Sequence, residues 1–219
     1  MIQVEFFAER AMLYELFSRL FTYPLDPGVL SVVAGLSTHE SPGKDSHAIA
    51  ENLAIMQEPV LGTEDLNLLV ETLNREATRL FEGPGQPIAP PYGSFYLNGK
   101  RLMGPEAIAV RKACLAAQML TDAENHQHPD HLALELGFLA ALAEAPTDEA
   151  VDHFRGFIAD HILSWLPMWK EDVMAAKPHP FFAGLVNFTK TTLEEDLAWI
   201  NEEYPMLALD KPVALEELI

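Results

Sequence analysis

Four residues with the potential for chemistry gather in one short stretch, "HQHPDH", which holds His126, His128, Asp130 and His131. Imidazole and carboxylate groups are common ligands of zinc and other transition metals. The spacing differs from HExxH, in which two histidines one helical turn apart share a face. A small metal-binding protein or metal-dependent hydrolase that uses these histidines is therefore the alternative hypothesis rather than the leading one.

Asp130 also has a simpler interpretation. It precedes "HLALELGFLAAL", an apolar pattern typical of a helix. An aspartate at the N-cap accepts hydrogen bonds from first-turn amides that otherwise have no partner. We expect Asp130 to cap the helix that follows it, and a cap at the edge of a groove can also bind a ligand.

Other motifs of catalysis are absent from the sequence. It contains neither GxxxxGK[ST] nor a GxGxxG between a strand and a helix. Ser94 in "YGSFY" lacks the second glycine of GxSxG. The only cysteine, Cys114, lies in a helical pattern and is expected to be a buried small hydrophobe. The sequence therefore predicts a protein that is not an enzyme and that holds no cofactor or metal.

The charge of the chain limits its partners. The 219 residues include 33 Asp and Glu against 14 Lys and Arg, which gives a net charge of −19. Such a surface repels phosphate backbones, and no local basic patch is evident, so we expect no nucleic-acid partner. It would instead attract a cationic partner.

The expected cellular location of the protein rests on the absence of a signal-peptide pattern and of a membrane-spanning run. The N-terminal segment, "MIQVEFFAERAMLYELF", has acidic residues and no basic region followed by a clean apolar run. No run approaches the roughly 20 apolar residues that cross a bilayer. A single cysteine excludes an internal disulfide and fits a reducing compartment. We expect a cytoplasmic protein that does not insert into the membrane.

Helical periodicity dominates the chain, and no alternating strand pattern is found. With 49% apolar residues, residues 1–219 can form a single all-α domain of about nine or ten helices. The tail, residues 201–219, is expected to be a docked extension. Asp26 and Thr63 are expected as N-caps. We expect helices over residues 6–21, 26–36, 48–57, 63–81, 106–122, 130–144, 148–165, 168–175 and 180–200.

The segment at about 82–105 interrupts this pattern. It is rich in proline and glycine and contains "APPYGSFYL", residues 89–97. Long irregular segments in compact domains are usually functional or disordered, and the aromatic residues argue against disorder. Further aromatic residues, such as Trp165 and Trp169, stand at expected helix junctions and favour core packing.

Taken in order, four blocks resemble the TorD/DmsD family of molybdoenzyme-specific chaperones. The proline-proline-aromatic loop followed some thirty residues later by P-D-H-L at a helix start is the specific part of the resemblance. It extends over about residues 5–200, with only the helical pattern in common at the start. The blocks are "LFEGPGQPIAPPYGSFYL", "HPDHLALELGFLAAL", "FIADHILSWLPMW" and "HPFFAGL".

The resemblance implies an all-helical chaperone without catalytic turnover. Members bind the twin-arginine signal peptide, and often the body, of an apo molybdopterin-containing oxidoreductase. They shield the signal until the cofactor is inserted and then release the enzyme to the twin-arginine translocase. The resemblance leaves monomer and domain-swapped dimer both open, as well as binding of a guanine nucleotide or of the molybdenum cofactor itself.

Signal-binding positions carried over from the family fall on the central blocks. Tyr92 is expected to be an apolar platform and Pro91 a stiffener of the loop. Asp130 is expected either to accept an arginine or to anchor the loop, and His131 to report pH or to hydrogen-bond the loop. Ala77 departs from members that carry a tryptophan there. The carried-over residues are Leu80, Pro91, Tyr92, Ser94, Tyr96, Asp130 and His131.

Overall fold

A computed structural model describes residues 2–37, 46–83, 85, 87–117 and 128–205. These residues form ten α-helices and no strand, which confirms the predicted all-α class. No helix among them is long and apolar enough to cross a bilayer. The helices are α1 (Val4–Leu20), α2 (Pro27–Gly35), α3 (Ser46–Leu61), α4 (Leu66–Ala77), α5 (Gly93–Leu97), α6 (Pro105–Ala116), α7 (Leu132–Glu144), α8 (Asp148–Gly156), α9 (Leu166–Ala175) and α10 (Pro180–Glu203).

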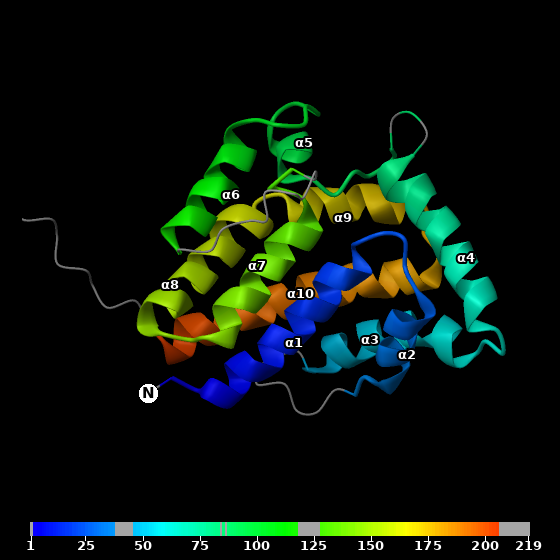
Figure 1. The fold of residues 1–219 in the computed structure, drawn as a ribbon, viewed down its shortest axis with the longest axis horizontal. Helices are drawn as coiled ribbons and strands as arrows, with labels where there is room; N and C mark the ends of the chain where they lie inside the picture. The colour runs from blue at the N-terminus through cyan, green and yellow to red at the C-terminus, as the bar shows by residue number, and fades with distance from the viewer. Residues whose placement is uncertain (1, 38–45, 84, 86, 118–127, 206–219) are drawn as a thin grey trace, which may run out of the picture.

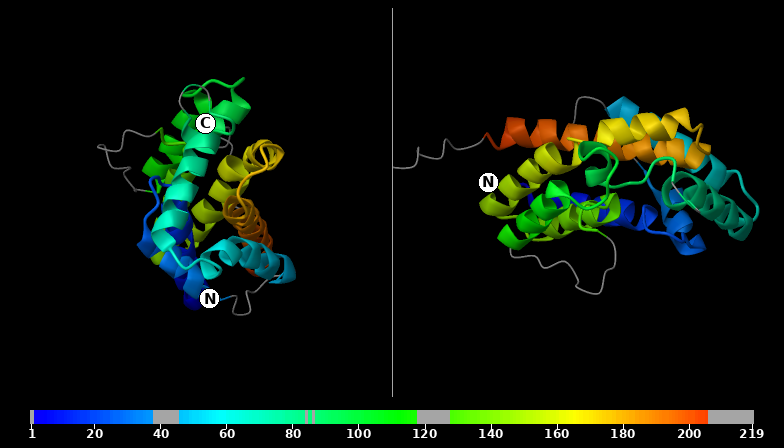
Figure 2. Two further views of the ribbon diagram at one scale, coloured as in Figure 1. Left: turned by 90° about the vertical axis from the view of Figure 1, so that its right-hand side faces the viewer. Right: turned by 90° about the horizontal axis from the view of Figure 1, so that it is seen from above.

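The helices form an elongated body whose central members pack in pairs. Helix α1 runs along α7, and α3 runs along α10. Figure 1 shows α4 at one end of the long axis and α6 with α8 toward the other. The view from above in Figure 2 places α6 and α7 on one side of the molecule and α9 and α10 on the other. The core between them is rich in large side chains, among them Trp165, Trp169, Tyr14, Phe17 and Phe154.

Most predicted helices are present, although the start of α4 was placed wrongly. The carboxylate of Asp26 caps α2, as predicted, by accepting hydrogen bonds from the amides of Gly28 and Val29. Thr63, however, is not the N-cap of the helix that follows. Its hydroxyl accepts the Asp65 amide in a local turn, and the Asp65 carboxylate caps α4. The carboxylate is the stronger acceptor, so the helix begins after the aspartate.

The proline-rich segment is more regular than its composition predicts. Helix α4 continues into a π-helical turn, η1 (Thr78–Glu82), and the segment later forms the short helix α5. Helix α8 likewise continues into a π-helical segment, η2 (Phe157–Ile162). Both π-helical segments lie beside the proline-rich segment or the helix that follows it, α6. π-Helical turns are frequent at functional sites.

A buried ion pair joins the two ends of the described chain. The Arg10 guanidinium in α1 lies 2.7 Å from a carboxylate oxygen of Asp196 in α10. The Tyr14 hydroxyl donates to the other oxygen at 2.8 Å. All three side chains are buried. Such a pair holds two helices together only because each charge is matched, since removing one partner leaves the other charge buried.

A close approach between α3 and α10 depends on Gly184 in α10. A Cβ atom added there would lie 2.3 Å from the backbone nitrogen of Met56 in α3. A backbone atom cannot rotate away as the end of a side chain can. The contact between α3 and α10 therefore requires glycine at this position.

We predict that Gly184→Ala lowers the free energy of unfolding by roughly 1–3 kcal/mol or more, because α3 and α10 must move apart. Urea unfolding followed by circular dichroism measures this change. Gly156→Ala is the matched control, since a Cβ at Gly156 meets nothing within 4 Å and its backbone is helical. Equal stability of the two variants would contradict the close approach of α3 and α10.

Candidate functional site

The structure brings together the two most specific blocks of the sequence, residues 91–94 and 130–132. The Leu132 amide donates to the Pro91 carbonyl at 2.9 Å, and the Gly93 amide donates to the Asp130 carbonyl at 3.0 Å. Tyr92 and His131 thereby form an isolated antiparallel bridge. The proline-rich loop is thus fixed against the start of α7 by main-chain hydrogen bonds.

Asp130 is a helix cap, but not of the helix that the sequence indicated. Its carboxylate oxygen Oδ2 accepts the Ser94 amide of α5 at 2.7 Å. This amide lies in the first turn of α5, where it has no partner within the helix. The prediction that Asp130 caps its own helix is therefore wrong. Asp130 is fully buried, and this hydrogen bond supports its expected role as the loop anchor.

His131 is the residue that caps α7. Its ring nitrogen Nδ1 accepts the Ala133 amide at 3.1 Å. Burial, with a smaller contribution from His128, lowers the pKa of His131 from 6.5 to about 4. The ring is consequently neutral near pH 7, which the cap requires, because a protonated Nδ1 cannot accept a hydrogen bond. The ring therefore bonds to its own helix, whereas the predicted hydrogen bond was to the loop.

Tyr92 is one of two aromatic residues in "APPYGSFYL" that remain partly open to solvent, the other being Tyr96. Tyr92 is half-buried, with its ring centroid 4.8 Å from that of His131 and 5.9 Å from that of His128, both edge to face. Its immediate neighbours Pro91 and Gly93 are buried. The loop therefore holds the Tyr92 side chain at the surface between two buried residues.

Three of the carried-over residues contact the interior, although Tyr96 is itself only half-buried. Ser94 and Leu80 are both fully buried. Leu80 holds the loop through its backbone, because its carbonyl accepts the Ala89 amide at 2.7 Å. Tyr96 stacks on Trp165, with ring centroids 5.9 Å apart and planes 15° apart. These residues shape the loop from beneath.

The tryptophans confirm the expected core packing and add a role that sequence reasoning missed. Both Trp165 and Trp169 are buried. The indole nitrogen of Trp169 donates to the Ala89 carbonyl at 2.9 Å and so fixes the start of the loop. Trp165 lies against Gly93, where an added Cβ would lie 3.0 Å from its indole nitrogen. The glycine of "APPYGSFYL" therefore permits close contact between the loop and Trp165.

The metal hypothesis finds no support among the described residues. No group of three or more His, Cys, Asp or Glu side chains in that part of the chain could hold a metal ion. His126 lies outside the described residues. One nitrogen of His131 is already occupied by the Ala133 amide.

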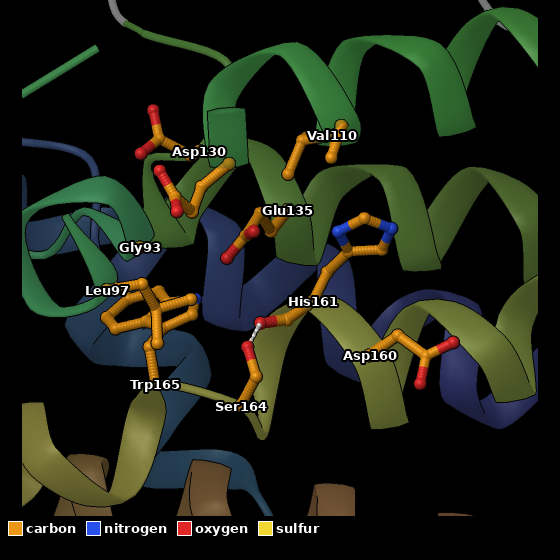
Figure 3. A pocket seen from close by; sticks show the side chains of 11 residues that line it. Gly93, Leu97, Val110, Asp130, Glu135, Asp160, His161, Ser164 and Trp165 are labelled. Carbon is orange, nitrogen blue, oxygen red and sulfur yellow. Dashed lines mark hydrogen bonds between the residues drawn. The ribbon is translucent and has the colours of Figure 1, made fainter. Parts of the chain in front are cut away.

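A pocket of about 120 Å³ lies behind the loop, between α5, α6, α7 and η2 (Figure 3). Its lining includes four carboxyl groups, those of Glu106, Asp130, Glu135 and Asp160. Glu135 was missed by the sequence reasoning. The available signal was a glutamate inside "HLALELGF", since a helix that is apolar on nearly all sides is expected to be buried.

Comparison with known proteins identifies the same family that the sequence motifs resemble. The family described as "Nitrate reductase delta subunit" matches residues 43–171. The chaperone protein TorD of Aliivibrio salmonicida is 27% identical over 163 residues, which cover 64% of this chain and 76% of that protein. The Tat proofreading chaperone DmsD of Salmonella typhi is 26% identical over 126 residues, covering 57% and 60%.

A solved structure supports the fold. A redox enzyme maturation protein from Archaeoglobus fulgidus superposes with a TM-score of 0.50 at 21% identity, covering 84% of this chain and 93% of that one. The sequence relatives are named as chaperones rather than as enzymes. Their names agree with the expected absence of catalytic turnover.

We predict that the cap of α7 makes stability depend on pH. The pKa of His131 is about 4 in the folded protein, compared with the ordinary value of 6.5 that applies to the unfolded chain. The stabilisation is therefore complete above pH 6.5 and is lost as the pH falls toward 4, by up to about 3 kcal/mol. In His131→Asn, asparagine can still cap the helix but does not titrate. Urea unfolding at a series of pH values should give a smaller loss for His131→Asn than for the wild type, and parallel curves would contradict the prediction.

A second prediction concerns the anchor of the loop. Asp130→Ala leaves the buried Ser94 amide without an acceptor, which costs about 1–3 kcal/mol of unfolding free energy. Asp130→Asn keeps an acceptor oxygen in nearly the same place and should cost less. Urea unfolding distinguishes the two variants. If alanine and asparagine were equally tolerated, the hydrogen bond to Ser94 would not be what holds the loop.

Proposed function

The chain belongs to the nitrate reductase delta subunit family, the family of the TorD and DmsD chaperones, and we propose that it binds the twin-arginine signal peptide of an apo molybdopterin oxidoreductase. Its coarser role, that of a chaperone in molybdoenzyme maturation, follows from the family itself. The signal peptide is held until the cofactor has been inserted, and the enzyme is then released for export. The observation that carries this proposal is Tyr92, an aromatic side chain held at the surface between two buried residues of the loop.

Rigidity of the loop supports recognition of a peptide. The main-chain hydrogen bonds to residues 130–132 and the Trp169 contact fix the loop before any ligand arrives. A preformed site loses less conformational freedom on binding than a loop that must become ordered. Tyrosine suits such a site, because its ring offers a large contact area with few rotatable bonds.

Charge and exposed apolar side chains fit the two parts of the signal. A twin-arginine signal has a basic pair followed by an apolar stretch. The net charge of −19 favours approach of the basic pair. Near the loop, four large apolar side chains are exposed, which can contact the apolar stretch: Leu97, Leu102, Met103 and Ile108.

The proposal also includes the location of the protein and the receiver of the released client. We locate it in the cytoplasm, where a signal peptide is held before export begins, and we propose the twin-arginine translocase as the receiver of the released client. Nothing in this role requires nucleic acid or insertion into a membrane. The monomer and the domain-swapped dimer are both compatible with a site built, as here, from residues of one chain.

Co-purification tests the proposed function. A tagged chain expressed in its source organism under anaerobic growth should bring down a molybdopterin oxidoreductase whose twin-arginine signal is uncleaved, as read by mass spectrometry. Recovery of that enzyme only in its cleaved, cofactor-loaded form would contradict the proposal. Expression of the client without its signal peptide is the control, and it should reduce recovery.

We further predict that Tyr92→Ala weakens binding of the source organism's twin-arginine signal peptides by about tenfold, because the aromatic contact is lost. Tyr92→Phe keeps the ring and should bind nearly as well as the wild type. Isothermal titration calorimetry with synthetic peptides measures both. Since Tyr92 is only half-buried, thermal unfolding of Tyr92→Ala should remain cooperative. Unchanged affinity in a folded Tyr92→Ala protein would exclude this residue from the site.

A further inference from the structure

The pocket behind the loop is strongly acidic, and its lining contains no positively charged side chain. Of the groups that line it, four are carboxyl groups, and the remaining titratable one is His161. Burial lowers the pKa of His161, although Asp160 acts in the opposite direction, so the ring is neutral near pH 7. Exposed residues at the rim, Leu97, Asp160 and Ser164, place its mouth at the surface.

Three carboxyl groups in this pocket, those of Glu106, Asp130 and Glu135, each have one buried oxygen without a hydrogen-bond partner, and two of these residues are themselves fully buried. Oδ1 of Asp130 and Oε2 of Glu135 have none, although the two side chains are only 0% and 1% exposed. Figure 3 shows the carboxyl group of Glu135 projecting from α7 toward the ring of Trp165. The indole nitrogen of Trp165 makes no hydrogen bond of good geometry either, although it lies close enough to the Glu135 carboxyl group to act against the rise of its pKa. Buried polar atoms in native proteins are nearly always paired, so these atoms require an explanation.

We infer that the pocket binds the guanidinium group of an arginine, with the Glu135 carboxylate as its principal acceptor and Asp130 Oδ1 as the second. This inference rests on the proposed function, because the arginine is taken to be one of the pair in the client's signal peptide. It adds Glu135 to the binding residues, and it gives the buried oxygens the donors that they lack.

Size and chemistry favour guanidinium over ammonium. A volume of about 120 Å³ equals that of about four water molecules and accommodates the carbon and nitrogens of one guanidinium group. Guanidinium is less strongly hydrated than ammonium and therefore loses less on entering a pocket. Its planar donors can reach carboxylates from two directions, and it stacks on aromatic faces such as that of Trp165.

Protonation of Glu135 couples this site to pH. Burial, followed by the charge of Asp130, raises the pKa of Glu135 well above 4.5, which favours the neutral acid in the empty pocket. An arriving cation favours the carboxylate, so the proton leaves to solvent as the cation binds. Affinity therefore rises with pH, by up to tenfold per unit. The titratable groups that face Glu135 are Asp130, Glu106, Cys114, Asp160 and His161.

The variant Glu135→Gln tests the site, because glutamine resembles the neutral acid in shape and cannot accept a proton. Glu144→Gln is the matched control: it lies on the same helix, is exposed, and removes the same charge. If Glu135→Gln proves unstable, Ala109→Leu fills the pocket from α6 without changing any charge. Calorimetry would use the source organism's signal peptides with the arginine pair intact or replaced by two lysines.

The wild type should bind the arginine peptide at least about tenfold more tightly than the lysine peptide. Glu135→Gln and Ala109→Leu should lose most of this preference, whereas Glu144→Gln should keep it. Titrations in buffers of different ionisation enthalpy should show proton release by the wild type and none by Glu135→Gln. A folded Glu135→Gln protein with the wild-type preference for arginine would overturn the inference and leave the proposed function intact.

A probe that needs no signal peptide distinguishes failure of the guanidinium site from failure of the proposed function. N-acetyl-arginine amide at millimolar concentration should shift the indole NH resonance of Trp165 in the wild type and not in Glu135→Gln, and the lysine analogue should have little effect. If the wild type shows this shift but binds no signal peptide, the proposed function fails and the guanidinium site stands. If the shift is absent in the wild type, the site itself is refuted.

Discussion

One buried carboxylate determines how the functional surface is built. Asp130 uses its main-chain carbonyl to accept the Gly93 amide and its side chain to accept the Ser94 amide. Two segments that lie 36 residues apart are thereby held in one register. The position of Tyr92 at the surface follows from that register, and so does the wall of the acidic pocket on the other side of the loop. The other oxygen of Asp130 has no hydrogen-bond partner, and the residue lines that pocket. One side chain thus connects the outer aromatic surface to the inner acidic one.

The aromatic loop is an element of structure in its own right rather than a connection. Its apolar side chains pack downward against Trp165 and Trp169, and its polar main-chain groups are satisfied by α7 and by the Trp169 indole. Both requirements explain its composition. Proline removes amide groups that would need partners, and Gly93 allows the chain to approach Trp165 closely. A polar, flexible connector could meet neither requirement, because it would leave the tryptophans uncovered.

Periodicity was sufficient to predict the helical class and most helix positions, because core-facing residues recur regularly. It could not decide which of two neighbouring acceptors caps a helix. Asp130 and His131 both qualify by type, and only the tertiary contact with Ser94 shows that the aspartate is already engaged. Thr63 and Asp65 present the same ambiguity. Glu135 was missed for another reason. A single acid in an apolar helix gives no indication of whether it meets a cation, a proton or empty space, since its neighbours come from α6 and η2.

The ion pair between Arg10 and Asp196 spans 186 residues, and α10 is also the helix against which α3 packs most extensively. During translation, at about 5–20 residues per second, the first helices must wait roughly 10–40 seconds for the last one to be synthesised. Until it leaves the ribosome, Arg10 remains in water and the groove for α10 stays open. The nascent chain therefore cannot complete its native packing before α10 has been synthesised. A chaperone of this design therefore cannot bind its client in the native conformation while its own α10 is still being synthesised.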